Sequence, residues 1–112
     1  INVEVMDTPD KRMKGLMFRE KLNENDGMLF IFDEPGQYNF WMKNMKISID
    51  MVFLDENKKI IDIYRNVPPC IIENCPTYGP DAKSMYVIET KAGFSRKFEL
   101  GYNDQVQFFT DK

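Results

Sequence analysis

The sequence of 112 residues contains no histidine. This absence excludes Ser-His-Asp triads, Cys-His pairs and metal sites that are built on imidazole ligands. Carboxylate, arginine and tyrosine chemistry remains open to the chain. The sequence also lacks any run of about 18 apolar residues, which a helical membrane span would need.

A basic surface is missing as well. The formal net charge is -3 and the sequence pI is about 5.0. Basic side chains occur in short, isolated pairs such as Lys58-Lys59 and Arg96-Lys97, whereas nucleic-acid binding needs them clustered. The glycines are isolated too, so no phosphate-binding loop is present. We therefore expect neither a nucleic-acid partner nor a cofactor.

Cysteine is scarce, and both cysteines lie in one proline-flanked loop, as Cys70 and Cys75. The even count and the short spacing favour a structural disulfide in an oxidising compartment. A redox pair or half of a metal site remains an alternative, although redox motifs normally use a tighter spacing. The chain begins with strand-like residues 1–5, which predicts that a signal or anchor segment preceded it. We expect an extracytoplasmic protein, secreted or membrane-anchored, that touches the membrane only through such an anchor.

What is present is typical of a globular domain: 43% of residues are hydrophobic, 13% aromatic and 29% charged. We expect a single β-rich domain over residues 1–112. The hydrophobic pattern predicts strands at residues 1–6, 28–32, 38–42, 49–54, 59–64, 85–90 and 105–109. It predicts a short helix at residues 9–14, a turn or helix at 92–98, and a hairpin turn at 55–58. The expected fold is mainly β: a small antiparallel β-barrel or sandwich with one or two short helices.

Two acids interrupt apolar strands, Asp50 and Glu89. Such an acid either faces solvent or is buried with a partner, because unpaired burial is costly. Arg12 and Arg19 are the candidate partners. Two strand carboxylates could serve as the acid and base of a glycosidase. The same residues could equally form a structural ion-pair network, and the sequence favours that interpretation.

The segment from Tyr38 to Met45 contains the only tryptophan, Trp41. Trp41 and Tyr38 could form an aromatic platform for a sugar or a cation, with Asn44 hydrogen-bonded to the ligand. Alternatively, Trp41 fills one end of a barrel and Asn44 turns the chain. The eight methionines raise the question of copper(I), but without histidine they are more typical of a packed core.

Several segments, taken in order, resemble one known family. They are Arg12-Met13-Lys14-Gly15-Leu16-Met17-Phe18-Arg19, Gly27-Met28-Leu29-Phe30-Ile31-Phe32, Phe40-Trp41-Met42-Lys43-Asn44, Cys75-Pro76-Thr77-Tyr78 and Tyr86-Val87-Ile88-Glu89. Together they resemble DUF192, a family of unknown function. Met45 departs from the family pattern, which usually has threonine there.

The resemblance implies a compact β-rich fold and frequent export, with no agreed activity. The polar residues of the family motifs correspond to Arg12, Arg19, Trp41, Asn44, Asp50 and Glu89. We expect an envelope-associated domain that binds a small polar ligand or a polysaccharide at a polar, aromatic-edged pocket. The alternatives are a carboxylate-dependent enzyme that uses Asp50 and Glu89, and a structural or protein-interaction domain. The oligomeric state stays open.

Overall fold

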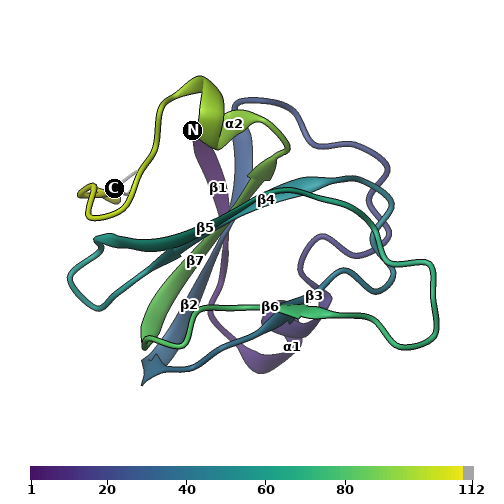
Figure 1. The fold of residues 1–112 in the computed structure, drawn as a ribbon, viewed down its shortest axis with the longest axis horizontal. Coiled ribbons are helices and arrows are strands. Elements are labelled where there is room, and N and C mark those ends of the chain that lie inside the picture. The colour runs from purple at the N-terminus through teal and green to yellow at the C-terminus, as the bar shows by residue number, and fades with distance from the viewer. Residues whose placement is uncertain (110–112) are drawn as a thin grey trace.

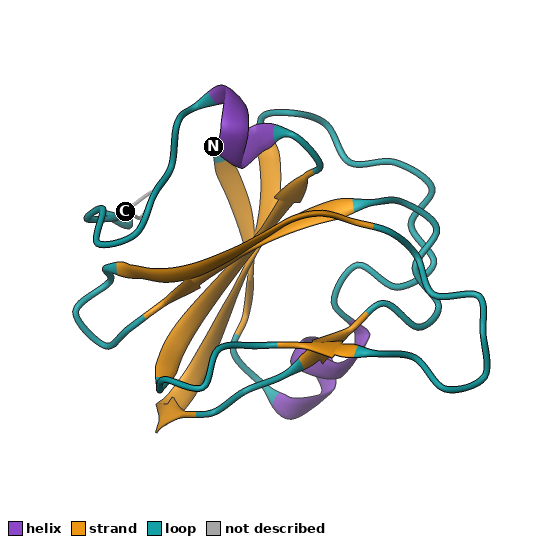
Figure 2. Cartoon of the chain, in the orientation of Figure 1, coloured by secondary structure: helices purple, strands orange, loops and turns teal. Residues whose placement is uncertain are grey.

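The computed structural model describes residues 1–109, whose strands form one large sheet and one small sheet (Figure 1, Figure 2). The large sheet has the order β1-β2-β7-β4-β5. Its strands are β1 (Asn2–Met6), β2 (Asp26–Gly36), β4 (Ile49–Leu54), β5 (Ile60–Val67) and β7 (Ser84–Lys91). The small sheet pairs β3 (Phe40–Trp41) with β6 (Thr77–Tyr78), and the helices are α1 (Pro9–Lys14) and α2 (Phe94–Lys97). The mainly β class with two short helices is confirmed.

The sheet is mixed and open, which corrects two details of the expected fold. β1 pairs with β2 in parallel, whereas the other neighbouring strands are antiparallel. Parallel neighbours need a crossover connection, and residues 7–25, which include α1, supply it. β1 and β5 are the two edges of the sheet. The fold is therefore a sandwich-like arrangement, and the closed barrel is wrong.

Local sequence explains α1. Thr8 caps the helix, because its hydroxyl accepts a hydrogen bond from the backbone N–H of Lys11 at 3.3 Å, and Pro9 fits the first turn. The helix ends at Gly15, which has a φ of 45°. A Cβ there would lie 3.0 Å from the ring of Phe30. A glycine at this position thus permits the positive φ of the turn, and its lack of a Cβ lets the chain pass close to Phe30 on β2.

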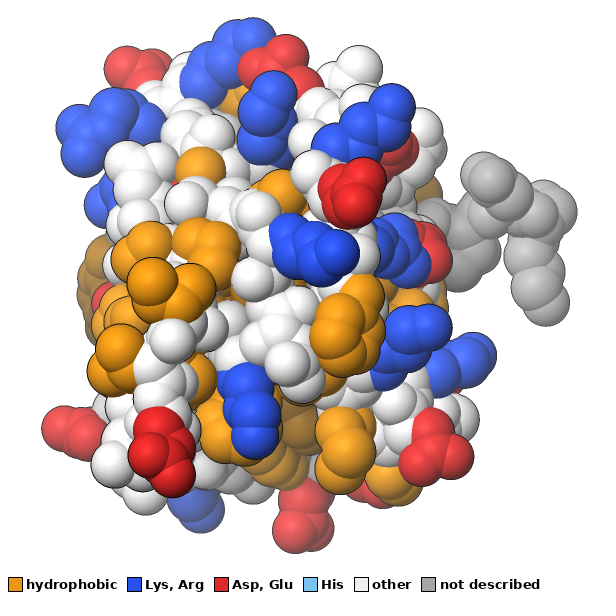
Figure 3. Space-filling view, turned by 90° about the vertical axis from the view of Figure 1, so that its right-hand side faces the viewer, with side chains coloured by type: hydrophobic (Ala, Val, Ile, Leu, Met, Phe, Trp, Pro, Cys, Tyr) orange, Lys and Arg blue, Asp and Glu red, His pale blue; other side chains and the backbone are white. Residues whose placement is uncertain are grey.

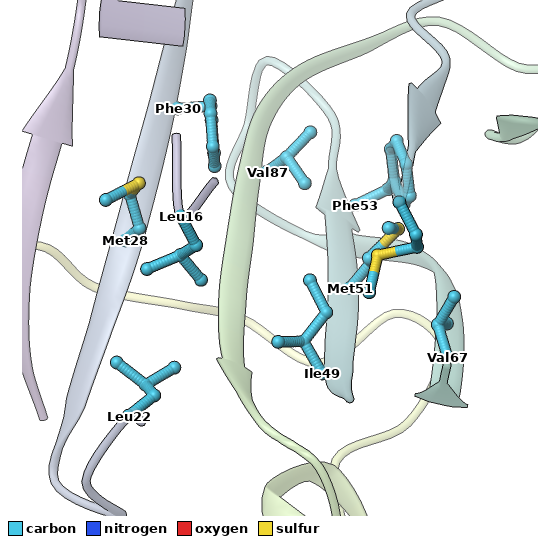
Figure 4. Close-up of a cluster of buried hydrophobic side chains, with 10 residues drawn as sticks. Leu16, Leu22, Met28, Phe30, Ile49, Met51, Phe53, Val67 and Val87 are labelled. Carbon is cyan, nitrogen blue, oxygen red and sulfur yellow. The ribbon is translucent and has the colours of Figure 1, made fainter. Parts of the chain in front are cut away.

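The large sheet is buried on both faces at its centre. Figure 1 shows the small sheet and α1 together on one side and the segment after α2 on the other. The first face carries the main core, shown in Figure 4, which includes Leu16, Leu22, Met28, Phe30, Met42, Ile49, Met51, Phe53, Val67 and Val87. The second face carries Val52, Leu54 and Ile60, packed against Ile63, Tyr86, Ile88, Leu100, Val106 and Phe108. Every residue of β4 is buried as a result.

The hairpin between β4 and β5 is confirmed. The carboxylate of Asp55 accepts hydrogen bonds from the backbone N–H groups of Asn57 at 2.9 Å and Lys59 at 3.0 Å. The expected strand at residues 105–109 is wrong, because only Gln105 forms a bridge, with Lys59. Aromatic packing holds that segment instead: the ring of Phe108 meets Tyr86 edge-on at 5.1 Å.

The disulfide between Cys70 and Cys75 is confirmed. The backbone N–H of Cys70 donates to the carbonyl of Met42 at 3.2 Å, so the ring is attached to the segment that follows β3. Ile71 and Ile72 within the ring are 94% and 64% exposed. Over residues 1–109, none of the helices is long and apolar enough to cross a membrane.

Candidate functional site

Glu89 is an acid buried within the main core face. It lies on β7 between its cross-strand partners Met28 on β2 and Met51 on β4, and it is 4% exposed. No side chain among residues 1–109 forms a hydrogen bond or salt bridge with its carboxyl. Burial raises the pKa of Glu89 to about 8, because the charged form loses its hydration without gaining a partner. The acid is therefore mostly protonated at neutral pH.

A cavity of about 330 Å³ opens beside this acid. It is bounded by α1 and the residues that follow it, by β2, and by β3 with its flanking residues. Its lining consists of Arg12, Met13, Lys14, Gly15, Leu16, Met17, Phe30, Phe32, Tyr38, Asn39, Phe40, Trp41, Met45 and Glu89. Most of this surface is aromatic, aliphatic or thioether, and Glu89 is the one acid among the lining residues.

The aromatic wall of the cavity is held by ring contacts. Phe32 and Tyr38 stack with centroids 3.6 Å apart, and Phe30 meets Phe40 edge-on at 5.0 Å. The hydroxyl of Tyr38 donates to the carbonyl of Glu34 at 2.6 Å. Packed rings with few free rotations form a wall that needs little ordering when a ligand arrives.

Cationic side chains stand among the lining residues. Arg12 donates one hydrogen bond to the carbonyl of Ile31 at 2.8 Å, and its guanidinium carbon lies 5.2 Å from the ring centroid of Phe32. Lys14 follows on the same helix. Neither forms a salt bridge with a carboxylate among residues 1–109. Trp41 is 47% exposed and also lines the cavity.

Asp50 lies on the opposite face of the sheet and has a different environment. Its cross-strand partner is Thr90, whereas Glu89 is paired with Met51, and side chains alternate between faces along a strand. One carboxylate oxygen accepts the N–H groups of Asn66 at 2.8 Å and Gly93 at 3.3 Å. The other accepts the N–H of Ser95 at 2.9 Å and its hydroxyl at 2.7 Å.

This geometry corrects the paired-carboxylate hypothesis. Asp50 and Glu89 do not flank a common cleft, because they point to opposite sides of one sheet. The acceptor capacity of Asp50 is taken up by holding the start of α2 and the end of β5, which is a structural role. Neither arginine forms a salt bridge with either acid, so the expected ion-pair network is also wrong.

Arg19 and Asn44 lie outside the cavity. Arg19 forms a bidentate salt bridge with the carboxylate of Glu4 on β1, and this contact lowers the pKa of Glu4. Asn44 adopts a φ of 63°, and its carbonyl accepts the N–H of Phe18 at 2.8 Å. Asn44 thus turns the chain, as one of the two interpretations expected. Of the six candidate residues, the fold gathers Arg12, Trp41 and Glu89 at one cavity.

Sequence reasoning missed the aromatic wall. Phe30 and Phe32 follow Met28 at intervals of two on β2, so all three share the face of Glu89. That alternation was visible in the sequence, but the register that sets it beside β7 was not. Within residues 1–109, no three His, Cys, Asp or Glu side chains are grouped so as to hold a metal. Met13, Met17 and Met45 belong to the cavity wall.

Comparison with known proteins places the chain in a family. The model of the family DUF192, described as an uncharacterized ACR, matches residues 1–108. The chain is 29% identical over 110 residues to the UPF0127 protein PH1112 of Pyrococcus horikoshii, covering 96% of this chain and 88% of that protein. It is 30% identical over 108 residues to a UPF0127 protein of Thermococcus sibiricus, covering 95% of this chain and 65% of the relative.

Solved structures share the fold. A crystal structure of a protein of unknown function from Novosphingobium aromaticivorans superposes with a TM-score of 0.87 at 26% identity, covering 95% of this chain and 74% of the other. A proposed transcription regulator from Sinorhizobium meliloti superposes with a TM-score of 0.85 at 31% identity, covering 92% and 78%. The family match spans nearly the whole sequence and agrees with these likenesses. The chain belongs to the DUF192 family, whose curated relatives are called UPF0127 proteins.

Proposed function

We propose that this protein binds a small organic molecule in the cavity beside Glu89. The observation that carries the proposal is a buried carboxyl group with no partner among the described residues, at the wall of a mostly apolar cavity. Burying such a group without compensation costs stability. Ligand binding at the cavity would explain why the protein keeps a buried acid that lowers its stability. The cavity volume of about 330 Å³ lies within the range of small-molecule sites.

A compact ligand fits this site better than a sugar chain. Oligosaccharides need many polar partners, whereas the walls here are mainly rings, thioethers and aliphatic groups. Trp41 stands at the cavity with Lys43, whose ammonium lies 5.1 Å from the centre of its ring. A single, partly exposed tryptophan that already contacts the ammonium of Lys43 offers little stacking surface to a sugar polymer. The proposal is therefore a small molecule with a substantial apolar part.

We propose in addition that the protein works outside the cytoplasm. The closed Cys70–Cys75 ring is typical of oxidising compartments. Transcription regulation, the role proposed for the Sinorhizobium meliloti protein, is not favoured for this chain. Nucleic-acid binding needs clustered basic side chains, whereas this chain has a net charge of -3. On the face drawn in Figure 3, basic and acidic side chains are interspersed rather than separated.

A protein-interaction domain is the second candidate. It is favoured by Ile71 and Ile72, which the disulfide ring holds exposed. On the face drawn in Figure 3, hydrophobic side chains form one larger group at the left and smaller groups separated from it by polar and charged side chains. Interaction sites on proteins are usually larger and continuous. The small-molecule site is therefore the function that we favour.

The first experiment is a thermal-shift screen against aromatic and aliphatic acids, amines, alcohols and oligosaccharides. A ligand at about 100 times its Kd adds about 2.7 kcal/mol to the free energy of unfolding, which is a shift of several degrees for a domain of this size. Trp41 is the only tryptophan in the chain. Its fluorescence therefore reports binding at the cavity directly.

The matched variants are Trp41→Ala and Tyr102→Ala. Both remove an exposed aromatic ring, but only Trp41 lines the cavity. We expect the first variant to weaken a hit at least several-fold and the second to leave it unchanged, measured by calorimetry. A screen without hits would contradict the proposal and favour the protein-interaction domain.

A further inference from the structure

We infer that the ligand is an organic anion that enters the cavity with its apolar end first. Its negative group stays with Arg12 and Lys14, while its apolar body lies along the aromatic wall and covers Glu89. This inference rests on the proposed function, and it adds the charge and the orientation of the ligand.

The ionisable groups that line the cavity are mostly cationic. Arg12 and Lys14 both belong to the lining, and Glu89 is the one acid among the lining residues. Four cations of the described chain form salt bridges, namely Lys11, Arg19, Lys46 and Lys97. Arg12 and Lys14 are among the described cations that form none, so their charge is available to a ligand. Lys43 adds a third positive charge beside Trp41. A chain with a net charge of -3 thus presents a locally positive lining at this cavity, which attracts anions.

Arg12 is held in place and keeps donors for a ligand. One of its nitrogens is occupied by the carbonyl of Ile31, which fixes the guanidinium against the ring of Phe32. The remaining N–H groups are free to meet a ligand. A planar guanidinium in a fixed position is well suited to a carboxylate, because it offers two parallel donors.

Glu89 does not oppose the binding of an anion. Its strand neighbours are Met28 and Met51, so no cation on the sheet is paired with it. Of the charged residues on the elements packed around it, Arg12 and Lys14 on α1 share the cavity lining with Glu89. The others are Asp26, Asp33 and Glu34 on β2, Asp50 on β4, Lys91 on β7, Asp10 and Lys11 on α1, and Arg19, Glu20, Lys21 and Glu24 in the segment after α1. With the pKa of Glu89 raised to about 8 by burial, the acid is mostly neutral at pH 7. A neutral acid tolerates an apolar neighbour, whereas a carboxylate would have to lose still more water.

The orientation predicts a pH dependence with a definite sign. An apolar body against Glu89 favours the protonated acid, so affinity is constant below pH 8 and falls about tenfold per pH unit above it. A ligand that inserted an ammonium group would behave oppositely. It would bind the carboxylate form, and its affinity would rise as the pH increased towards 8.

The test uses three probes with one carbon skeleton: phenylpropionate, phenylpropylamine and phenylpropanol. Each is titrated from pH 6 to pH 9.5 with Trp41 fluorescence, excited where the probes do not absorb, and with calorimetry. We expect phenylpropionate to bind at least tenfold more tightly than the amine at pH 7. We expect the alcohol to lie between them, because it keeps the apolar contacts and loses the contact with the cations.

Variants assign the effect to named groups. Arg12→Gln should weaken phenylpropionate about tenfold or more and change phenylpropanol little. Lys14→Gln should weaken phenylpropionate about two- to fivefold. Lys11→Gln is the matched control on the same helix, because Lys11 does not line the cavity, and it should have no effect. Glu89→Gln should keep the binding of phenylpropionate and remove its loss above pH 8.

The outcomes distinguish two claims: that the ligand is an organic anion, and that the cavity binds a small molecule at all. Tighter binding of the amine or the alcohol, or affinity for phenylpropionate that rises with pH, overturns the inference and leaves the proposed function in place. An equal loss in the Lys14 and Lys11 variants also overturns it, because binding would then reflect general charge. If no probe binds at millimolar concentration, both the inference and the cavity as a small-molecule site are contradicted.

Discussion

Asp50 and Glu89 are two buried acids, 39 residues apart in sequence, on adjacent strands of one sheet. They look alike in the sequence, because each interrupts an apolar strand. Asp50 accepts four hydrogen bonds from Asn66, Gly93 and Ser95. Glu89 accepts none from the described residues, and its pKa is raised to about 8.

The difference follows from what covers each face of the sheet. Asp50 faces the start of α2, where backbone N–H groups are left without helical partners. Glu89 faces a chamber of rings and thioethers, where no donor reaches it. Asp50 thus stabilises the fold, whereas the charged form of Glu89 destabilises it. Functional sites are enriched in buried ionisable groups with shifted pKa values, and this enrichment is why the proposed function is placed at Glu89.

The largest expected effect comes from Asp50→Asn. The variant replaces one acceptor oxygen with an NH₂ group that faces the donors of Ser95 or Asn66. Stranding these buried donors should lower the free energy of unfolding by about 3 to 5 kcal/mol. Urea denaturation measures this directly. Arg19→Gln, which breaks an exposed ion pair, serves as the comparison and should cost less than about 1 kcal/mol. Equal losses in both variants would contradict the structural role of Asp50.

The next effect concerns the pH profile of stability at Glu89. Between pH 4.5 and pH 8 the folded protein holds a proton that the unfolded chain has released, so stability falls as the pH rises. From pH 5 to pH 8 this contribution is about 3 to 4 kcal/mol. Glu89→Gln cannot lose the proton, so its profile should lack this decline and the variant should exceed the wild type at pH 9. Denaturant titrations measure the free energy of unfolding at each pH. If it depended on pH in the same way for the wild type and Glu89→Gln, the raised pKa of Glu89 would be contradicted.

The smallest effect separates the donors of Asp50. Ser95→Ala removes the hydroxyl that donates at 2.7 Å and keeps the backbone N–H of the same residue. We expect a loss of about 1 to 2 kcal/mol in the free energy of unfolding, well below that of Asp50→Asn. A loss as large as that of Asp50→Asn would mean that the hydroxyl alone secures the carboxylate.

The candidate site could be predicted in part. Sequence reasoning selected Glu89, Arg12 and Trp41, because an acid in a strand, an arginine beside an apolar segment and a lone tryptophan are unusual locally. It grouped Asp50 with them for the same reason. Adjacent residues on any strand face opposite sides, but only the strand register shows that Met51, and not Asp50, is paired with Glu89 and shares its face.

The sequence by itself determined the mainly β class, the capped helix α1, the hairpin at Asp55 and the disulfide, because each depends on residues close together in the chain. Tertiary structure alone decided the parallel edge strand, the open sheet and the cavity. These depend on which strands become neighbours and in what register, and contacts between segments far apart set both. The same long-range contacts surrounded Asp50 with donors and left Glu89 without one. Two acids with similar local sequence therefore acquired opposite physical properties.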